Sequence, residues 1–239
     1  MSQIVTSAVR QSERARVPKC HVNPYNSFPQ PASGDPSPVR SPIASVVFDI
    51  GWVLVHLDYS RLTDFLREHG VDVEKMHDVF ARAELAQHES GQLPGERLLE
   101  NLAGLGDRPM DAATLRSCWL DMFELQVPMV DLARRLAECY RVHLLSNVGD
   151  LHWEHFSREY GLHRLGHGAL PSFVAGVMKP QPGIYAQAER RFGLEPARTV
   201  FIDDLAANVD GARERGWHGV RHVGYQETVQ ALAELGVPA

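Results

Sequence analysis

Apolar residues follow two different spacings along the chain, and the change between them divides the sequence. In residues 59–138 they recur at helical spacing, as in Leu62 and Leu66. Short runs of Val, Leu and Phe instead predict buried strands at 46–48 and 140–145. Roughly 80 residues separate these strands, whereas one crossover helix needs about a dozen. The pattern therefore predicts a helical subdomain inserted between the first two strands of a sheet.

From residue 140 onward, strands alternate with helices. The alternation predicts an α/β fold with a doubly wound parallel sheet, in which residues 127–136 form the crossover helix after the insertion. The predicted strands are 140–145, 172–174, 199–202 and 219–223, and the predicted helices are 150–160, 182–192, 206–215 and 226–235. The core then comprises residues 44–58 and 127–239, and the inserted helical subdomain comprises residues 59–126.

Residues 1–43 differ from the rest of the chain in composition. Seven prolines interrupt a polar run that has no sustained apolar periodicity. Such a segment buries too little apolar surface to offset the entropy of ordering it. We therefore predict a disordered, Pro-rich tail, with a docking segment as the alternative.

Composition and charge narrow the class of protein. The chain has 239 residues, of which 44% are hydrophobic, and its formal net charge of -6 argues against a nucleic-acid partner. No window approaches the roughly 18 apolar residues of a membrane span, and the first residues lack the apolar block of a signal peptide. We therefore expect a cytoplasmic protein that contacts neither nucleic acid nor membrane. The sequence leaves the oligomeric state open.

Polar side chains follow the strands of the predicted sheet. The carboxyl ends of parallel strands meet at one edge, where doubly wound proteins collect their chemistry. At this edge the sequence places a carboxylate, a hydroxyl with an amide, an ammonium and a pair of carboxylates: Asp49, Ser146 with Asn147, Lys179, and Asp203 with Asp204. Each alone has an ordinary explanation, such as a helix cap or a favourable place near a helix N-terminus. All four in this order on one edge favour a functional site.

The order of these groups resembles the four motifs of the haloacid dehalogenase (HAD) superfamily over residues 45–239, and in particular the glucose-1-phosphate phosphatase-like group. The matching motifs are Asp-x-Gly at 49–51, Leu-Ser-Asn at 145–147, Lys-Pro at 179–180 and Asp-Asp-x-x-x-Asn at 203–208. The segment 88–93 and Trp119 resemble the helical cap of that group, which covers the active site and helps to choose the substrate. The resemblance implies that the inserted helical subdomain is such a cap.

The resemblance implies a magnesium phosphatase that attacks with Asp49. Two unit negative charges about 4 Å apart cost on the order of 4 kcal/mol at an effective dielectric near 20, so positive charge must be present when an aspartate approaches a phosphate. The group implied to hold Mg²⁺ is Asp49, the Gly51 carbonyl, Asp203 and Asp204, with Lys179 as a second cation and with Ser146 and Asn147 as hydrogen-bond donors to the phosphate. Oxygen ligands suit magnesium better than zinc, and the histidines between 143 and 167 match no zinc-ligand pattern.

Two residues depart from the family pattern. Most HAD phosphatases have a second aspartate where this chain has Gly51, and that aspartate is the general acid for the leaving group, a role typically worth about 10² to 10⁴-fold. Bound water, His56 or Asp58 could take over, or the substrate could have a good leaving group. Gly51 also allows the chain to turn sharply after Asp49. The second departure is Trp52, at a position where the group often has Asn. The resemblance therefore does not identify the substrate.

We therefore predict a Mg²⁺-dependent phosphatase of a small phosphorylated metabolite, with sugar phosphates among the candidates, acting through an aspartyl-phosphate on Asp49. One alternative is a haloacid dehalogenase-type hydrolase, in which the same aspartate displaces halide without a metal. The pair Asp203 and Asp204 argues against it, because two carboxylates that face a third have no evident purpose without a cation. The other alternative is a non-catalytic phosphometabolite-binding module that lost turnover with its general acid.

Overall fold

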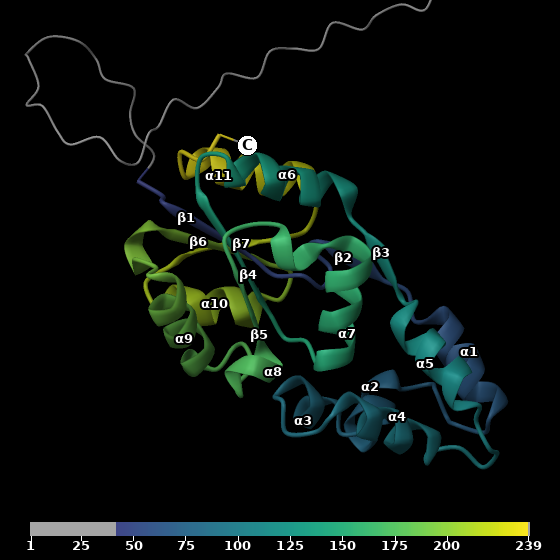
Figure 1. Ribbon diagram of the computed structural model, residues 1–239. Coiled ribbons are helices and arrows are strands. Elements are labelled where there is room, and N and C mark those ends of the chain that lie inside the picture. The colour runs from purple at the N-terminus through teal and green to yellow at the C-terminus, as the bar shows by residue number, and fades with distance from the viewer. Residues whose placement is uncertain (1–41, 239) are drawn as a thin grey trace, which may run out of the picture. The chain divides into compact units, whose positions relative to one another are not determined.

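The protein is described by a computed structural model that covers residues 42–238, so the predicted Pro-rich tail lies almost wholly outside the described residues. Five strands form one parallel sheet with the order β5-β4-β1-β6-β7 (Figure 1). They are β1 (Ser45–Phe48), β4 (Arg141–Ser146), β5 (Ala169–Pro171), β6 (Thr199–Asp203) and β7 (His218–Arg221). This sheet confirms the predicted α/β fold.

Helices cover both faces of the sheet. On one face lie α6 (Val127–Ala137) and α11 (Tyr225–Glu234), and on the other lie α9 (Pro182–Phe192) and α10 (Ala206–Glu214) (Figure 1). Successive residues of a strand point to opposite faces. Val46 and Phe48 accordingly pack in the cluster that contains α6 and α11, and Val47 packs in the cluster that contains α9 and α10. β1 is therefore buried on both faces. Because the strand ends at Phe48, the next residue lies at the carboxyl edge of the sheet.

The third strand differs from the prediction. Residues 172–174, predicted as a strand because Phe and Val favour strands, lie in the short helix α8 (Ser172–Ala175), and the strand β5 directly precedes it. β5 is an edge strand whose Pro171 pairs with Ser146 at the end of β4. Proline lacks the N–H for a ladder bond, which an edge strand tolerates. Pairing with β4 therefore outweighed the local strand propensity.

The other predicted elements of the core are found close to their expected bounds. The helix predicted at 150–160 is α7 (Asp150–His155), continued by a π-helical turn (Phe156–Tyr160). Both α6 and α9 have a proline in the first turn, where its missing N–H is not needed. Short 3-10 turns complete the connections at Leu162–Arg164 and Pro196–Arg198. Within the described residues, no helix combines the length and apolar character that crossing a membrane requires.

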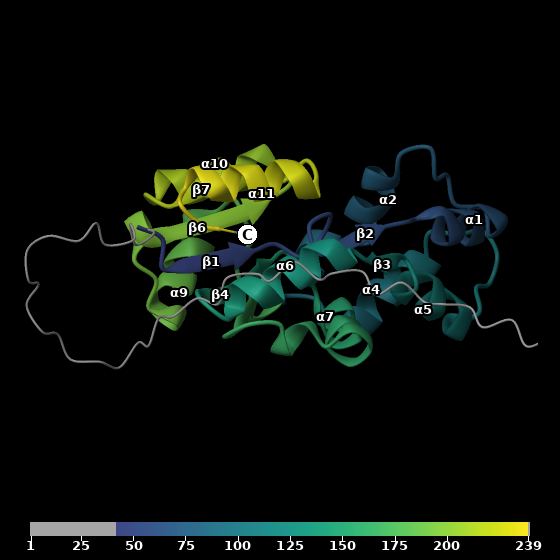
Figure 2. The ribbon, with the colours of Figure 1, turned by 90° about the horizontal axis from the view of Figure 1, so that it is seen from above.

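An inserted helical cap lies between β2 (Val55–Leu57) and β3 (Phe123–Leu125). Its helices are α1 (Ser60–Glu68), α2 (Met76–Arg82), α3 (Leu85–Glu89), α4 (Gly95–Ala103) and α5 (Ala112–Leu120). They enclose an apolar cluster of their own that includes Leu98 and Trp119. β2 and β3 pair antiparallel and join the cap to the core (Figure 2). The helical spacing of apolar residues includes Phe123, but this residue lies in the strand β3, so the structure differs from the prediction there. The cap boundaries at 59 and 126 stay a prediction.

Candidate active site

The register of the central strands brings the predicted site residues to one edge. Phe48, the last residue of β1, is aligned with Ile202 of β6. Asp49 follows directly, and its N–H donates to the Ile202 carbonyl at 2.9 Å. Since β4 ends at Ser146 and β6 ends at Asp203, both residues lie beside Asp49 at the carboxyl edge.

Lys179 joins two of the predicted carboxylates. Its Nζ lies 2.8 Å from Asp49 Oδ1 and 2.7 Å from Asp203 Oδ2, and none of the three side chains is more than 9% exposed. Asp203 also accepts hydrogen bonds from the Leu205 N–H and the Asn208 amide. A buried ion pair is tolerated when further hydrogen bonds satisfy its remaining lone pairs. The three charged groups thus form one connected unit at the ends of β1 and β6.

Asn147 binds the backbone of Lys179. Its Nδ2 donates to the Lys179 carbonyl at 2.9 Å, and its Oδ1 accepts from the Lys179 N–H at 2.8 Å. These bonds fix the segment that carries the ammonium, and they use one of the two amide N–H groups. The predicted contact of the other N–H with phosphate stays a prediction, as does the one from Ser146, a neighbour that lowers the pKa of Asp49.

Asp49, Asp203 and Asp204 form the cluster predicted to hold a metal. One carboxylate oxygen from each lies within 4.8 Å of the others. Three negative charges converge where Lys179 supplies one positive charge, and oxygen donors are the ligands that Mg²⁺ prefers. The donor set and its charge therefore fit a magnesium ion. Within residues 42–238 the histidines form no comparable group.

Burial changes the proton affinity of the site. Burial raises the pKa of Asp49 to about 7, with Lys179 lowering it and Asp203 raising it further. Burial, and next the charge of Asp203, also raise the pKa of Asp204. For Lys179, burial opposes the charged form, but the two carboxylates prevail and raise its pKa, so the ammonium stays charged. Lys179 thus offsets part of the effect of burial and favours the ionised form of Asp49.

The turn after Asp49 is built differently from the expectation. The N–H groups of residues 53–55 donate to the Ile50 carbonyl, and the Ile50 N–H donates to Asp49 Oδ1 at 2.7 Å. The left-handed residue is Trp52, with φ 57°. Gly51 does not have a positive φ, and a Cβ there would meet only Leu57, at an ordinary 3.9 Å. The expectation that Gly51 supplies the sharp turn is therefore wrong, and position 51 has room for a side chain.

The two residues considered in place of the general acid make other contacts. Asp58 is exposed and accepts the Ser60 N–H at 2.9 Å before α1, and this hydrogen bond lowers the pKa of Asp58. His56 packs edge to face against Trp52, with ring centroids 4.5 Å apart. A carboxylate that is held ionised at the surface is a poor proton donor, so Asp58 does not fit that role.

The cap places near the site a carboxyl group that was not among the residues predicted from the sequence. Glu89, the last residue of α3, is partly buried, and its charge interacts with Asp49 and Lys179. Burial first, and then Asp49, raise the pKa of Glu89 to about 7, while Lys179 lowers it. The resemblance of residues 88–93 to a cap segment pointed to the right stretch, but no local signal indicates which of its side chains faces Asp49.

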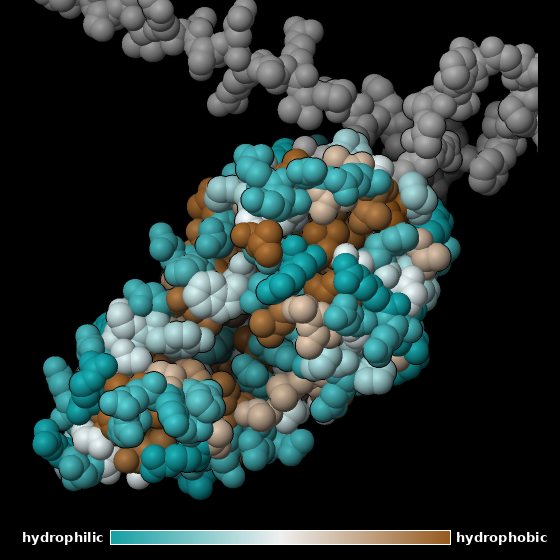
Figure 3. Space-filling model, turned by 180° about the vertical axis from the view of Figure 1, so that it is seen from behind, coloured by the Kyte–Doolittle hydropathy of each residue, from teal (hydrophilic) through white to brown (hydrophobic). Residues whose placement is uncertain are grey.

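One cavity, of about 440 Å³, includes Trp52 and Asp204 and so reaches the site. Another, of about 330 Å³, is lined by α3 and by residues 176–178, which precede Lys179, and contains none of the predicted site residues. Seen from behind, the surface is hollowed where the cap meets the core (Figure 3). A small ligand could therefore reach Asp204 from the cavity beside Trp52.

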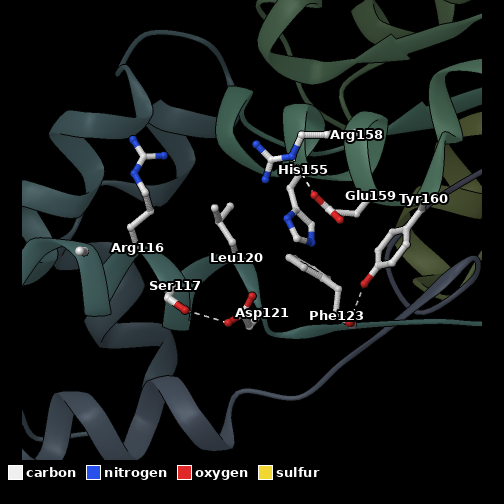
Figure 4. A pocket seen from close by; sticks show the side chains of 10 residues that line it. Arg116, Ser117, Leu120, Asp121, Phe123, His155, Arg158, Glu159 and Tyr160 are labelled. Atoms are coloured by element: carbon white, nitrogen blue, oxygen red, sulfur yellow. Dashed lines mark hydrogen bonds and ion pairs between the residues drawn. The ribbon is translucent and has the colours of Figure 1, made fainter.

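A larger pocket, of about 570 Å³, lies away from the aspartates. Figure 4 shows its lining from α5 and the π-helical turn, with Arg158 and Asp121 among the charged side chains. These charges have local partners: Arg158 donates to Glu159, and Ser117 donates to Asp121. The lining contains none of the predicted site residues, so size alone does not locate the chemistry.

The fold and the convergent aspartates identify the class of protein. The model of the haloacid dehalogenase-like hydrolase family matches residues 43–216, and the chain belongs to that family. The predicted HAD membership is thus confirmed, and the protein is an enzyme of the HAD-like hydrolase class.

Individual relatives agree with this assignment. The D-ribitol-5-phosphate phosphatase of Bacteroides thetaiotaomicron is 26% identical over 184 residues, which cover 73% of this chain and 89% of that protein. A HAD-like family hydrolase from Porphyromonas gingivalis has a TM-score of 0.69 at 25% identity, covering 82% of this chain and 99% of that one. A HAD family enzyme from B. thetaiotaomicron, solved with magnesium and inorganic phosphate, has a TM-score of 0.68 at 23% identity, covering 75% and 93%, and shows the likeness of fold alone.

Proposed function

We propose that the protein is a Mg²⁺-dependent phosphatase that hydrolyses a small phosphorylated metabolite through an aspartyl-phosphate on Asp49. The observation that carries this proposal is the contact between Asp49 and the buried Lys179 ammonium, at the edge where Asp203 and Asp204 converge. The relative that acts on D-ribitol 5-phosphate supports the same class of reaction.

In the proposed reaction a carboxylate oxygen of Asp49 attacks the phosphorus of the ester. Lys179 holds that carboxylate and offers its charge to the phosphate oxygens, to which Ser146 and the second N–H of Asn147 can donate. An aspartyl-phosphate forms as the alcohol departs. Water then attacks the phosphorus, releases inorganic phosphate and restores the Asp49 carboxylate.

The metal would be held by Asp49, the Gly51 carbonyl, Asp203 and Asp204. Both oxygens of Asp203 already accept hydrogen bonds, from Lys179, Asn208 and Leu205, which favours Asp204 as the more direct ligand. A bound Mg²⁺ supplies positive charge that offsets the repulsion between Asp49 and the phosphate.

The carboxylate cluster favours a phosphatase over the metal-free dehalogenase. Displacement of halide needs one ionised carboxylate. In this site Asp203 raises the pKa of Asp49 beyond the effect of burial, which weakens the nucleophile unless positive charge compensates. A metal enzyme gives the second and third carboxylates a purpose, and a dehalogenase does not.

For the substrate, we propose a phosphorylated polyol or sugar. The named substrate of the B. thetaiotaomicron relative supports this class, and the cavity of about 440 Å³ that includes Asp204 suits a small ligand. A cytoplasmic location stays a prediction, which the localisation of a tagged protein would test.

The experiment is a panel of phosphorylated polyols, sugars and haloacids, assayed for phosphate and halide release with Mg²⁺ and with excess EDTA. Native protein is compared with Asp49→Asn. We expect phosphate release that requires Mg²⁺ and is lost in the variant. Halide release in EDTA would favour the dehalogenase, and equal phosphate release by native protein and variant would exclude the covalent route.

A further inference from the structure

The end of α3 is fixed against the core beside the catalytic edge, and α3 lies next to α8 (Figure 1). The Ser172 hydroxyl donates to the Glu89 carbonyl at 2.6 Å and accepts from the Val148 N–H at 2.9 Å. Gly91 has φ +75°, and a Cβ there would lie 2.2 Å from the Phe173 carbonyl oxygen. These contacts tie the cap to the segments that follow β4 and β5. The core therefore sets the backbone position of Glu89.

The carboxyl group of Glu89 is partly buried, and its charge interacts with groups of the core and of the cap. The partners are Asp49 and Lys179 in the core and the phenol of Tyr59 in the cap. In the described part of the chain, no residue forms a hydrogen bond or ion pair with this carboxyl group. A partly buried acid without a protein partner is available to a ligand.

The leaving group needs a proton, and the core edge lacks the aspartate that donates it in most HAD phosphatases. Gly51 has no side chain, Asp58 is exposed and held ionised, and Lys179 is bound between two carboxylates. In-line displacement expels the leaving oxygen on the side away from the attacking group. The end of α3 is the part of the cap that is tied to the core beside the site, so an oxygen that departs toward the cap would meet Glu89.

We propose that Glu89 is the proton donor for the leaving group, an inference that rests on the proposed phosphatase function. As the bond from Asp49 to phosphorus forms and the ester P–O bond breaks, the Glu89 proton passes to the departing oxygen, which gives the free alcohol and a Glu89 carboxylate. In the second half-reaction the carboxylate takes a proton from the attacking water. The new P–O bond forms, the bond to Asp49 breaks, and Glu89 is protonated again, so the cycle needs no other reactant.

The proton affinity of Glu89 suits this exchange. Burial and the charge of Asp49 raise its pKa, Lys179 lowers it, and the resulting pKa of about 7 gives both protonation states at neutral pH. General acids work best when their pKa lies near the working pH. A donor on the cap would make simple alkyl phosphates, whose alkoxides leave poorly, accessible substrates despite Gly51.

The test measures how rate depends on the leaving group. Native protein, Glu89→Gln and the control Glu84→Gln are assayed with Mg²⁺ on 4-nitrophenyl phosphate and on ribitol 5-phosphate. Glu84 directly precedes the same helix as its N-cap residue. Its side chain is exposed and accepts a hydrogen bond from the Asn101 amide. We expect Glu89→Gln to lose about 10² to 10⁴-fold in kcat/KM on the alkyl ester and to change little on the aryl ester, which departs without a proton. The control should match native protein on both.

Other outcomes separate the two proposals. Equal losses on both esters, or no loss on either, would overturn the role of Glu89 while leaving the phosphatase intact. Native protein that hydrolyses neither these esters nor any of the panel would contradict the proposed function itself and remove the ground for the inference. Should Glu89→Gln fail to fold, native protein decides: rates that fall steeply as the leaving group becomes less acidic show that no donor acts. Recovery of the alkyl rate in Glu89→Gln by adding Gly51→Asp, at a position with room for a Cβ, would support the assignment.

Discussion

The carboxyl edge of the sheet and the end of α3 hold their acidic groups in different ways. At the edge, Asp49 and Asp203 are tied together through Lys179 by contacts of 2.8 and 2.7 Å. On the cap, Glu89 is held through its main-chain carbonyl, and its carboxyl group has no tie of that kind within the described residues. A nucleophile, the role proposed for Asp49, must keep one geometry through the reaction. A proton donor, the role proposed for Glu89, must adjust to each substrate that enters, and the two arrangements suit these two proposed roles.

The largest effect should come from breaking the edge itself. Asp49→Asn replaces the nucleophile by an amide, so turnover should fall by at least about 10³-fold. The substitution keeps the shape of the side chain, and a thermal melt should show the native transition. Native-like phosphate release from the folded variant would show that the edge does not act through covalent catalysis.

Removal of the metal should affect the edge next most strongly. In excess EDTA we expect no phosphate release, because repulsion among the three aspartates and the phosphate is then uncompensated. Magnesium at about 100 times its Kd should stabilise the fold by about 2.7 kcal/mol through binding to the native state. Urea unfolding with and without Mg²⁺ measures this, and Asp204→Asn serves as the comparison, since it should lose most of the shift. An equal shift in both proteins would place the metal elsewhere.

The difference in pH-dependent stability between native protein and Glu89→Gln should report on the cap side, because the raised pKa values of Asp49 and Asp204 affect both proteins. Burial raises the pKa of Glu89 from 4.5 to about 7, so the folded state binds the proton more tightly than the unfolded chain. In metal-free protein the contribution of Glu89 is therefore full below pH 4.5 and is lost as pH rises through 7, by on the order of 1 to 3 kcal/mol. Glu89→Gln should match native protein at low pH and exceed its stability at pH 8. Parallel urea curves at pH 5 and pH 8 that show no such divergence would contradict the burial of this carboxyl group.

The smallest effect should come from loosening the tie between the two regions. Ser172→Ala removes the donor to the Glu89 carbonyl and the acceptor for the Val148 N–H, at a cost of about 1 to 2 kcal/mol. If the tie positions the proton donor, hydrolysis of alkyl esters should weaken more than hydrolysis of aryl esters. Thr63→Ala, which removes an exposed hydroxyl bond within α1, is the matched control. Equal kinetics for both variants would show that the tie is structural only.

The sequence predicts the edge far better than the cap. Asp49 and Asp203 end strands whose apolar runs are visible in the chain, and parallel pairing then brings them together without further information. Lys179 follows no strand directly, yet it was found because its Lys-Pro motif resembles that of the family. Glu89 has no comparable signal, since its place depends on how the whole cap packs against α8 and on the fit of Gly91 against Phe173.

Local sequence was also a poor guide where backbone contacts between segments decided the outcome. Phe173 and Val174 favour a strand by propensity, but β4 pairs with the residues just before them. Gly51 was the natural choice for a sharp turn, yet the backbone adopts its left-handed conformation at Trp52. In the first case the pairing with another strand outweighed the preference of single residues, and in the second the hydrogen bonds of the turn to the Ile50 carbonyl did so.

The conformation of Trp52 has a consequence for protein engineering. A left-handed backbone costs a residue other than glycine roughly 1 to 2 kcal/mol, and this tryptophan is 42% exposed, so burial does not explain its presence. It lines the cavity that contains Asp204 and packs edge to face against His56. A change to Gly or Asn at position 52 would relax the backbone and would also reshape the wall of that cavity. A new cavity wall therefore need not cost stability. A saturation library at this one position is a compact way to search for altered substrate range without loss of the fold.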